Sequence, residues 1–230
     1  MHVRFSVASP GGDELPTDVV TYGPDVARED ALKLLGHVEG TRVLVLGCGT
    51  GHNAIALARH GAKVIGVDES SDQVADARAA CERERVKVEL HHAPLAELAF
   101  IRADTIDAVL SVWSLAAVDD IDRVFRQVDR VLRPEHPLVL SMPHPAFAMV
   151  DSTDHERRVQ RSYWETAGAE GTVPRTIQQL FTSLGRANFR VDTLLEPEPP
   201  ASGRRSAAWH DHMRYVPATV VLRARKQGMG

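Results

Sequence analysis

A glycine-rich segment and a later aspartate are the residues of this chain whose spacing points most directly to ligand binding. The segment Gly47-Cys48-Gly49-Thr50-Gly51 follows an apolar run at 42–46, and Asp68 ends the next such run. Glycines let a backbone approach a ligand closely, and the first turn of a following helix has unpaired amides. The carboxylate of Asp68 can accept both hydroxyl groups of a ribose. This pair predicts a site for an adenosine-containing ligand.

The spacing of the glycines distinguishes between two kinds of nucleotide site. A dinucleotide fingerprint, G-x-G-x-x-G, would place its third glycine at position 52, where this chain has His52. Nicotinamide-dependent oxidoreductases and epimerases often also have a Tyr-x-x-x-Lys pair, and no tyrosine of this sequence is followed by lysine at that spacing. The pattern therefore favours a ligand without a pyrophosphate. An NAD-dependent oxidoreductase or epimerase is the less favoured alternative.

The elements that must position these residues are short β-branched runs that alternate with longer amphipathic stretches between residues 42 and 141. This alternation is typical of repeated βαβ units around a parallel sheet. Ligands of such sheets bind beyond the carboxyl ends of the strands, where the glycine-rich segment and Asp68 should lie. We predict strands at 42–46, 64–68, 86–90, 106–112, 138–141, 189–195 and 218–224, and helices at 28–35, 53–60, 119–132 and 176–187, with one more helix capped by 70–72.

The chain divides into a short first part and one main domain. At 230 residues it is long enough for one sizeable core and short for two catalytic domains. We predict a lid with a helix at 1–40 and a ligand-binding domain at 41–230. Within that domain the polar, weakly patterned segment 143–174 is either an insertion that faces the substrate or a surface excursion.

Several segments together resemble, in the same order, the motifs of class I methyltransferases that use S-adenosylmethionine (SAM). The matching segments are 43–51, 67–70, 106–111, 130–134 and 138–141, and the resemblance covers approximately residues 20–225. It implies an α/β fold with a Rossmann-like, doubly wound and mostly parallel seven-stranded sheet. The two last strands resemble the antiparallel C-terminal hairpin of that family. SAM is the cofactor that the resemblance implies.

The resemblance also implies which residues contact SAM. Its methionine part would lie on the glycine-rich segment, its ribose on Asp68 and its adenine beside Glu69. The other implied contacts are Ser111 and Val112 under the sulfonium, Tyr22 of the lid near the methionine carboxylate, and Ala93, Pro94 and Leu95 near the adenine. Packing is an equally expected role for Tyr22. Pro94 stands where the family commonly has an acidic residue and cannot donate from its backbone, whereas Ala93 and Leu95 can.

The residues after the fourth predicted strand bear on the acceptor of the methyl group. They read Ser111-Val112-Trp113-Ser114, without the carboxylates of magnesium-dependent catechol-type enzymes, the Pro-Pro-aromatic turn of nucleobase amino enzymes or the Pro-Cys of cytosine C5 enzymes. We expect metal-independent methyl transfer to a small-molecule O-, N- or C-acceptor, driven mainly by alignment of the reactants. A SAM-binding sensor or scaffold without catalysis is the alternative.

Histidines are the candidate general bases. His144 follows the fifth predicted strand, so it should face the crevice, and a base would help if the acceptor is a hydroxyl or a protonated amine. A structural histidine between Pro143 and Pro145 is the alternative interpretation. His52, Tyr163 and His212 are weaker candidates. His210 and His212 have no third ligand at a fixed spacing, so no metal site is predicted.

The bulk composition argues against several classes of partner. The formal net charge is −4, which does not favour binding to a phosphate backbone. No apolar run approaches the roughly 20 residues that span a bilayer, and the first residues lack the apolar core of a signal peptide. The only cysteines are Cys48 and Cys81, which favours reduced thiols. We expect a cytoplasmic protein with a small-molecule substrate and with no nucleic-acid or membrane partner; the oligomeric state is not predicted.

Overall fold

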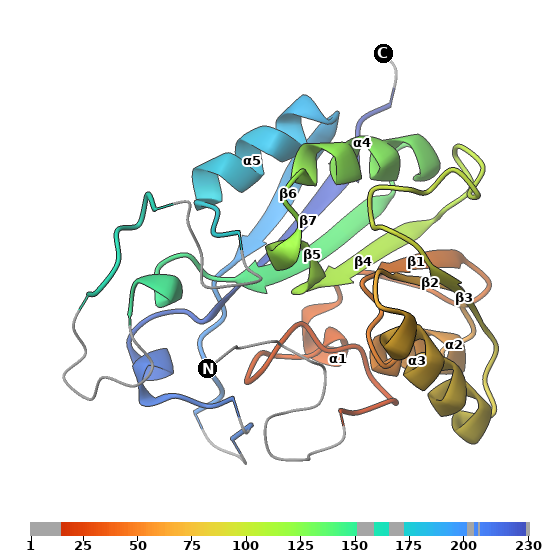
Figure 1. Cartoon of the computed structure of the whole chain (residues 1–230), viewed down its shortest axis with the longest axis horizontal. Helices are drawn as coiled ribbons and strands as arrows, with labels where there is room; N and C mark the ends of the chain where they lie inside the picture. Colours follow the sequence, from red (N-terminus) through yellow and green to blue (C-terminus); the bar gives the residue numbers. More distant parts are fainter. Residues whose placement is uncertain (1–14, 151–158, 166–172, 202–204, 207, 229–230) are drawn as a thin grey trace.

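The β-branched runs of the sequence form one twisted sheet of seven strands in the computed structural model (Figure 1). The structure describes residues 15–150, 159–165, 173–201, 205–206 and 208–228. The strands are β1 Arg42–Leu46, β2 Lys63–Asp68, β3 Val88–His92, β4 Ala108–Val112, β5 Pro137–Pro143, β6 Phe189–Leu195 and β7 Thr219–Lys226. Their order is β3-β2-β1-β4-β5-β7-β6. The first five strands are parallel, and β7 is antiparallel to both β5 and β6. This confirms the predicted fold class.

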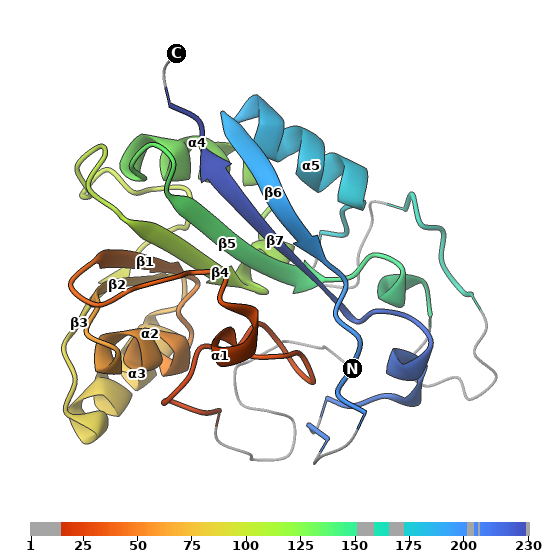
Figure 2. The ribbon, with the colours of Figure 1, turned by 180° about the vertical axis from the view of Figure 1, so that it is seen from behind.

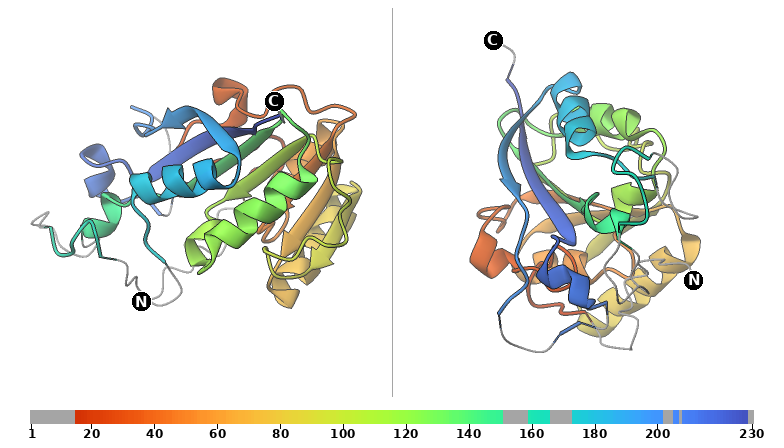
Figure 3. Two further views of the ribbon diagram at one scale, coloured as in Figure 1. Left: turned by 90° about the horizontal axis from the view of Figure 1, so that it is seen from above. Right: turned by 90° about the vertical axis from the view of Figure 1, so that its left-hand side faces the viewer.

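Helices cover both faces of the sheet. The helices are α1 Glu29–Leu32, α2 His52–Arg59, α3 Ser71–Glu84, α4 Ile121–Val131 and α5 Ile177–Arg186, with the short 3-10 helices η1 Ser114–Ala117, η2 Phe147–Met149 and η3 Asp211–Arg214. Helices α4 and α5 lie over the face seen in Figure 1, and α1 and α2 lie on the face turned to the viewer in Figure 2. The view from above in Figure 3 shows these two layers on either side of the strands. Within the described residues, no helix is long and apolar enough to cross a bilayer.

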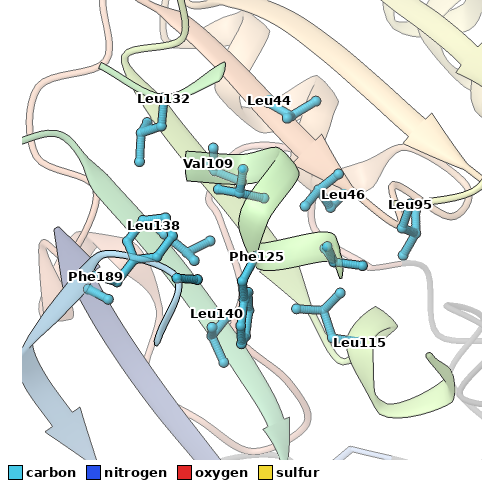
Figure 4. Packing of buried hydrophobic residues seen from close by; sticks show 14 of the residues in the cluster. Leu44, Leu46, Leu95, Val109, Leu115, Phe125, Leu132, Leu138, Leu140 and Phe189 are labelled. Carbon is cyan, nitrogen blue, oxygen red and sulfur yellow. The ribbon is translucent and has the colours of Figure 1, made fainter. Parts of the chain in front are cut away.

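Alternating side chains divide the core into two apolar layers, as the two-residue period of a strand requires. Leu44 and Leu46 of β1 join the cluster that contains Phe125 of α4, which lies beside Leu140 of β5 in Figure 4. Val43 and Val45 belong instead to the cluster on the side of α1 and α2. Burial of both faces explains why the central strands read as continuous apolar runs. Because these strands are parallel, the carboxyl ends of β1, β2 and β4 meet at one edge of the sheet, where a ligand would bind.

Two of the predicted elements whose bounds differ from the structure, the first helix and the third strand, show the physical reason for the difference. The helix predicted at 28–35 is only the single turn α1, because Lys33 adopts a left-handed conformation with φ +49° and ends it. The Glu29 carboxylate then accepts the backbone amides of Leu34 and Leu35 at 2.9 and 2.8 Å. The third strand begins at Val88 rather than at residue 86, because the amide of Val86 still donates to the carbonyl of Cys81 at the end of α3.

The described ends of segment 143–174 are held by the rest of the domain. Val150 and Val159 form an isolated antiparallel bridge, and the amide of Val173 donates to the carbonyl of Ala116 in η1 at 2.7 Å. The Arg175 guanidinium lies beside the same turn and donates to backbone carbonyls there. The residues 1–14, 151–158 and 166–172, on which parts of the predicted lid and insertion fall, lie outside the described residues.

Candidate active site

The glycine-rich loop turns the chain from β1 into α2 through three left-handed residues. Gly47, Gly49 and Gly51 have φ of +65°, +53° and +89°, a region that residues with a side chain rarely adopt. The amide of Gly47 donates to the carbonyl of Val67 at 2.8 Å, which fastens the loop to β2. Gly51 is the N-cap of α2 and provides no side-chain cap. The first amides of α2 therefore remain available to a polar ligand.

The carboxylate of Asp68 holds the glycine-rich loop in place. Its Oδ2 accepts the backbone amide of Gly49 at 2.8 Å, and its Oδ1 accepts that of Ser70 at 3.0 Å. Asp68 is half-buried at the carboxyl end of β2. An ionised carboxylate has about four acceptor positions, so two remain after these contacts. Asp68 can therefore accept the hydroxyl groups of a ribose without releasing the loop.

The residues predicted near the adenine are already joined to one another. The Glu69 carboxylate accepts the amide of Leu95 at 3.0 Å, and the amide of Ala93 donates to the carbonyl of Asp68 at 3.0 Å. Pro94 between them is exposed. The backbone amides of Ala93 and Leu95, which could have replaced the missing acidic residue in binding the adenine, thus both already donate hydrogen bonds within the protein. These contacts instead hold the loop after β3 against the end of β2.

Residues of the lid bind the first turn of α2. The side-chain Oδ1 of Asn53 accepts the amide of Thr21 at 2.9 Å, and its Nδ2 donates to the carbonyl of Thr21 at 3.1 Å. The Oγ1 of Thr21 also lies 3.3 Å from Nε2 of His52. His52 is buried, and its Nδ1 has no hydrogen-bond partner among the described residues. The lid is therefore anchored beside the glycine-rich loop.

The burial of His52 predicts a loss of stability in acid. Burial lowers the pKa of His52 from 6.5 to about 4. The unfolded chain therefore takes up this proton first as pH falls below 6.5, so the stability associated with neutral His52 is lost toward pH 4, by up to about 3 kcal/mol. Urea unfolding at pH 7 and pH 4.5 should show a smaller loss for His52→Gln than for the unchanged protein. The exposed His37→Gln is the matched control; an equal loss in all three proteins would contradict the assignment.

Tyr22 is fully buried in the lid. Its hydroxyl donates to the carboxylate of Glu29, and burial, followed by the charge of Glu29, raises the pKa of this hydroxyl far above its ordinary value. The hydroxyl thus has a partner within the protein, which favours the packing role over direct contact with a methionine carboxylate. Contact between Tyr22 and SAM stays a prediction.

The segment after β4 lies directly under the glycine-rich loop. Ser114 donates from its hydroxyl to the carbonyl of Leu46 at 2.8 Å, and its Oγ lies 2.7 Å from that of the buried Ser111. Val112 packs with the cluster on the α1 side. Trp113 has φ +61° and lies so close to Gly23 that a Cβ there would be 2.7 Å from the indole Nε1. The end of β4 therefore lies against both the lid and the glycine-rich loop.

Both ring nitrogens of His144 have partners. Its Nε2 lies 2.8 Å from a carboxylate oxygen of Glu196, and its Nδ1 accepts the backbone amide of Ala146 at 3.1 Å. A general base needs a free lone pair, and Nδ1 uses its own on the turn that follows β5. The geometry favours the structural alternative, and a catalytic role for His144 stays a prediction.

Cys48 lies within the loop but is not placed to act as a nucleophile. It is 3% exposed, and burial together with the nearby charge of Asp68 raises its pKa to about 12. Only the thiolate is nucleophilic, so the thiol is inert near neutral pH. In the described part of the chain no three His, Cys, Asp or Glu side chains are grouped so that they could hold a metal ion.

Fold and site together define the class of protein. The strand order of the sheet reverses between the parallel strands β1 and β4, and an uncapped helix start and an acid-bound glycine loop lie at that point. This arrangement is that of a Rossmann-like cofactor-binding domain. Dinucleotide-binding sheets of this kind usually continue with parallel strands after the fifth, whereas here the antiparallel β7 lies between β5 and β6. The open α2 amides and the spare acceptor positions of Asp68 fit a cofactor with an adenosine part.

Comparisons with known proteins point to one family within this class. Residues 43–135 match the family model described as a methyltransferase domain. A SAM-dependent methyltransferase from Mesorhizobium loti is 28% identical in sequence with a TM-score of 0.70, covering 84% of this chain and 94% of that one. Residues 43–135 thus match a methyltransferase domain, and the chain is similar in fold and sequence to SAM-dependent methyltransferases, which supports SAM as the cofactor.

Several curated relatives match about half of the chain. A ubiquinone biosynthesis O-methyltransferase from Bordetella avium is 35% identical over 102 residues, which are 44% of this chain and 42% of that protein. A demethylmenaquinone methyltransferase from Tropheryma whipplei is 34% identical over 120 residues, 51% of this chain and 48% of that protein. The match with these relatives thus spans about half of their length.

The sequence analysis did not predict the contacts near the site that join residues far apart in the chain. Asp25 of the lid accepts the backbone amide of Ser206 at 3.1 Å and also its hydroxyl. Ser114 was noted only as part of a motif, although it supports the loop through Leu46. An aspartate after a glycine and a proline is a common turn residue, so its sequence context did not indicate a distant partner.

Proposed function

We propose that this protein transfers the methyl group of SAM to a small-molecule acceptor without the help of a metal ion. The observation that carries the proposal is the 2.8 Å bond between the amide of Gly49 and the carboxylate of Asp68. This bond joins the two elements that would hold the methionine and ribose parts of SAM. It lies at the point where the strand order of the sheet reverses, which is where such sheets bind ligands.

The chain's own residues would hold and orient SAM. When bound, SAM supplies an electrophilic methyl group on a sulfonium. The open backbone of the glycine-rich loop and the first turn of α2 would bind the methionine part, Asp68 the ribose hydroxyls, and Glu69 would flank the adenine. The lid, pinned to α2 through Asn53, would exclude water from the reacting atoms. Alignment and exclusion of water can supply most of the acceleration of such a displacement.

The acceptor is proposed to be a small molecule that reaches the site from the side of β5 and β7. The lid at 1–40 and the segment 143–174 would face it. The names of two relatives refer to ubiquinone biosynthesis and to demethylmenaquinone, so hydroxylated ring compounds are the acceptors to test first. Amines and carbon acceptors remain in the proposal. The net charge of −4 supports neither a nucleic-acid nor an anionic membrane partner, and we propose a cytoplasmic location.

Calorimetric titration and an acceptor screen test this proposal. SAM and its demethylated product should both bind, and NAD should not, because the loop has His52 where a dinucleotide site needs glycine. Incubation with SAM and a panel of phenols, amines and activated carbon acids should release the demethylated product. Preferential binding of NAD would contradict the cofactor assignment. Tight binding of SAM with no turnover across the panel would instead support a sensor or scaffold.

A further inference from the structure

A pair of histidines in the loop between β6 and β7 contains a buried ring nitrogen that has no hydrogen-bond partner among the described residues. His212 is 4% exposed, and its Nε2 has no hydrogen-bond partner among the described residues. Its Nδ1 lies 2.6 Å from Nδ1 of His210, and the two rings are parallel within 3°. Buried polar atoms are nearly always hydrogen-bonded, so an unpartnered one calls for an explanation.

The hydrogen bonds of the pair determine where its protons lie. Nδ1 of His210 accepts the backbone amide of His212 at 3.3 Å, so this nitrogen carries a lone pair and no proton. A proton on Nδ1 of His212 suits both this amide and the 2.6 Å contact, whereas a proton on Nδ1 of His210 would face the amide hydrogen, so the geometry favours His212 as the donor. A neutral imidazole has one N–H, so Nε2 of His212 carries a free lone pair. A second side chain thus holds His212 in the tautomer of a general base.

The loop that carries this pair is bonded to both segments that are proposed to face the acceptor, the lid and the segment after β5. Ser206, near its start, is bound by Asp25 of the lid at 3.1 Å, and Ala218, at its end, accepts the amide of His144 at 2.9 Å. The loop therefore connects the lid to the carboxyl end of β5. Figures 1 and 2 both draw η3, which contains His212, beyond that strand end and near η2.

Two buried hydroxyl groups lie on the strand ends to which this loop is joined. Within the described residues, Oγ of Ser141 and Oγ1 of Thr219 have no hydrogen-bond partner. They lie on β5 and β7, which pair so that Ser141 is opposite Val221 and Thr219 opposite Pro143. Both side chains therefore face the same side of the sheet, at the strand ends where an acceptor would enter. A polar acceptor would supply the missing partners.

The other buried histidines are less suited to removing a proton from an acceptor. His144 uses Nδ1 on the amide of Ala146 and directs Nε2 at Glu196. His52 belongs to the cofactor loop, and burial lowers its pKa to about 4, which makes it a weak base. His212 is therefore the buried histidine whose tautomer and position both suit proton removal.

We propose that His212 is the general base of the methyl transfer, that His210 is its positioning residue, and that the acceptor carries a hydroxyl group. The inference rests on the proposed function. The acceptor proton moves to Nε2 of His212 as the hydroxyl oxygen forms its bond to the methyl carbon, and the electron pair of the carbon–sulfur bond stays on sulfur. His212 becomes an imidazolium whose Nδ1 proton remains bonded to His210. Release of the proton to water restores the base.

Phenols of graded acidity test the base directly in His212→Gln, which keeps a polar side chain but cannot take up the proton. With phenol, whose hydroxyl is protonated at neutral pH, kcat should fall by about 100-fold or more. With 4-nitrophenol, which is largely ionised, kcat should change little, because no base is needed. Equal losses with both acceptors would show a structural role and overturn the assignment. His37→Gln, at an exposed histidine outside the site, is the control and should keep the ratio of the two rates.

Two further measurements separate this inference from the proposed function. SAM should bind His212→Gln with unchanged affinity in calorimetry, which also shows that the variant folds. Nitrogen-15 NMR of the unchanged protein should find His212 protonated on Nδ1, and protonation on Nε2 would overturn the proposal whatever the acceptor. An unchanged protein that binds SAM yet methylates neither phenol nor any member of the acceptor panel would contradict the proposed function. Unchanged phenol turnover in His212→Gln would contradict the role of His212 alone.

Discussion

Asp68→Ala is expected to weaken SAM binding by about 10- to 100-fold. Hydrogen bonds to a charged group contribute about 1.5–3 kcal/mol, and the substitution removes the acceptor that the ribose hydroxyls would use. It also frees the amides of Gly49 and Ser70, which the carboxylate now holds at 2.8 and 3.0 Å. The loop would then be less well ordered before the cofactor arrives. Calorimetric titration with SAM measures the combined effect.

Asp68→Asn tests how much of the SAM affinity depends on the charge of this side chain, because asparagine has nearly the same shape. Its amide oxygen can still accept one backbone amide, but its NH2 group would face the other donor. The affinity should therefore fall nearly as far as in the alanine variant, although the volume is kept. Asp76→Ala, which removes an exposed carboxylate from α3, is the matched control and should bind SAM normally. Full affinity in Asp68→Ala would mean that the ribose is held elsewhere.

The strands could be predicted because the central ones, β1, β2, β4 and β5, are buried on both faces, and because recognisable turns separate the strands from the helices. The bounds of β1 and β6 were predicted correctly, and those of the other strands differ by a few residues at their ends. The helix predicted at 28–35 failed because tertiary contacts overrode its local pattern. The Glu29 carboxylate accepts Leu34 and Leu35 amides that a longer helix would have used internally. Helix propensity alone does not account for side-chain hydrogen bonds that replace those of the helix.

The cofactor side of the site was predictable for a similar reason. The glycine-rich loop and Asp68 follow directly from two strand ends, so chain order and sheet geometry bring them together. The acceptor side depends on pairs far apart in sequence, such as Asp25 with Ser206 and His144 with Glu196. No local pattern specifies these pairs. The tautomer of His212 likewise follows from a contact with His210 that spacing cannot show.

Gly47→Ala should destabilise the protein by about 2–4 kcal/mol and abolish tight SAM binding. A Cβ at this position would lie 2.0 Å from Cβ and 2.5 Å from Oγ of Ser114. Ser114 cannot easily yield, because its hydroxyl is bonded to the carbonyl of Leu46 at 2.8 Å. Overpacking costs about 1–3 kcal/mol, and the φ of +65° adds strain for any residue with a side chain. Urea unfolding and SAM titration give the two values.

A second substitution distinguishes the clash from the backbone strain. Ser114→Gly removes both atoms that the new Cβ would meet, so Gly47→Ala with Ser114→Gly should unfold at a higher urea concentration than Gly47→Ala alone. Recovery should be partial, since the left-handed φ at residue 47 remains. Gly185→Ala is the control: a Cβ there meets nothing within 4 Å, and alanine in α5 should raise stability by about 0.5–1 kcal/mol. If Gly47→Ala unfolded at the same urea concentration as the unchanged protein, the close contact of the loop with Ser114 would be wrong. SAM would then have to bind a glycine-rich loop that is wider than the one that the Asp68 carboxylate holds in this structure.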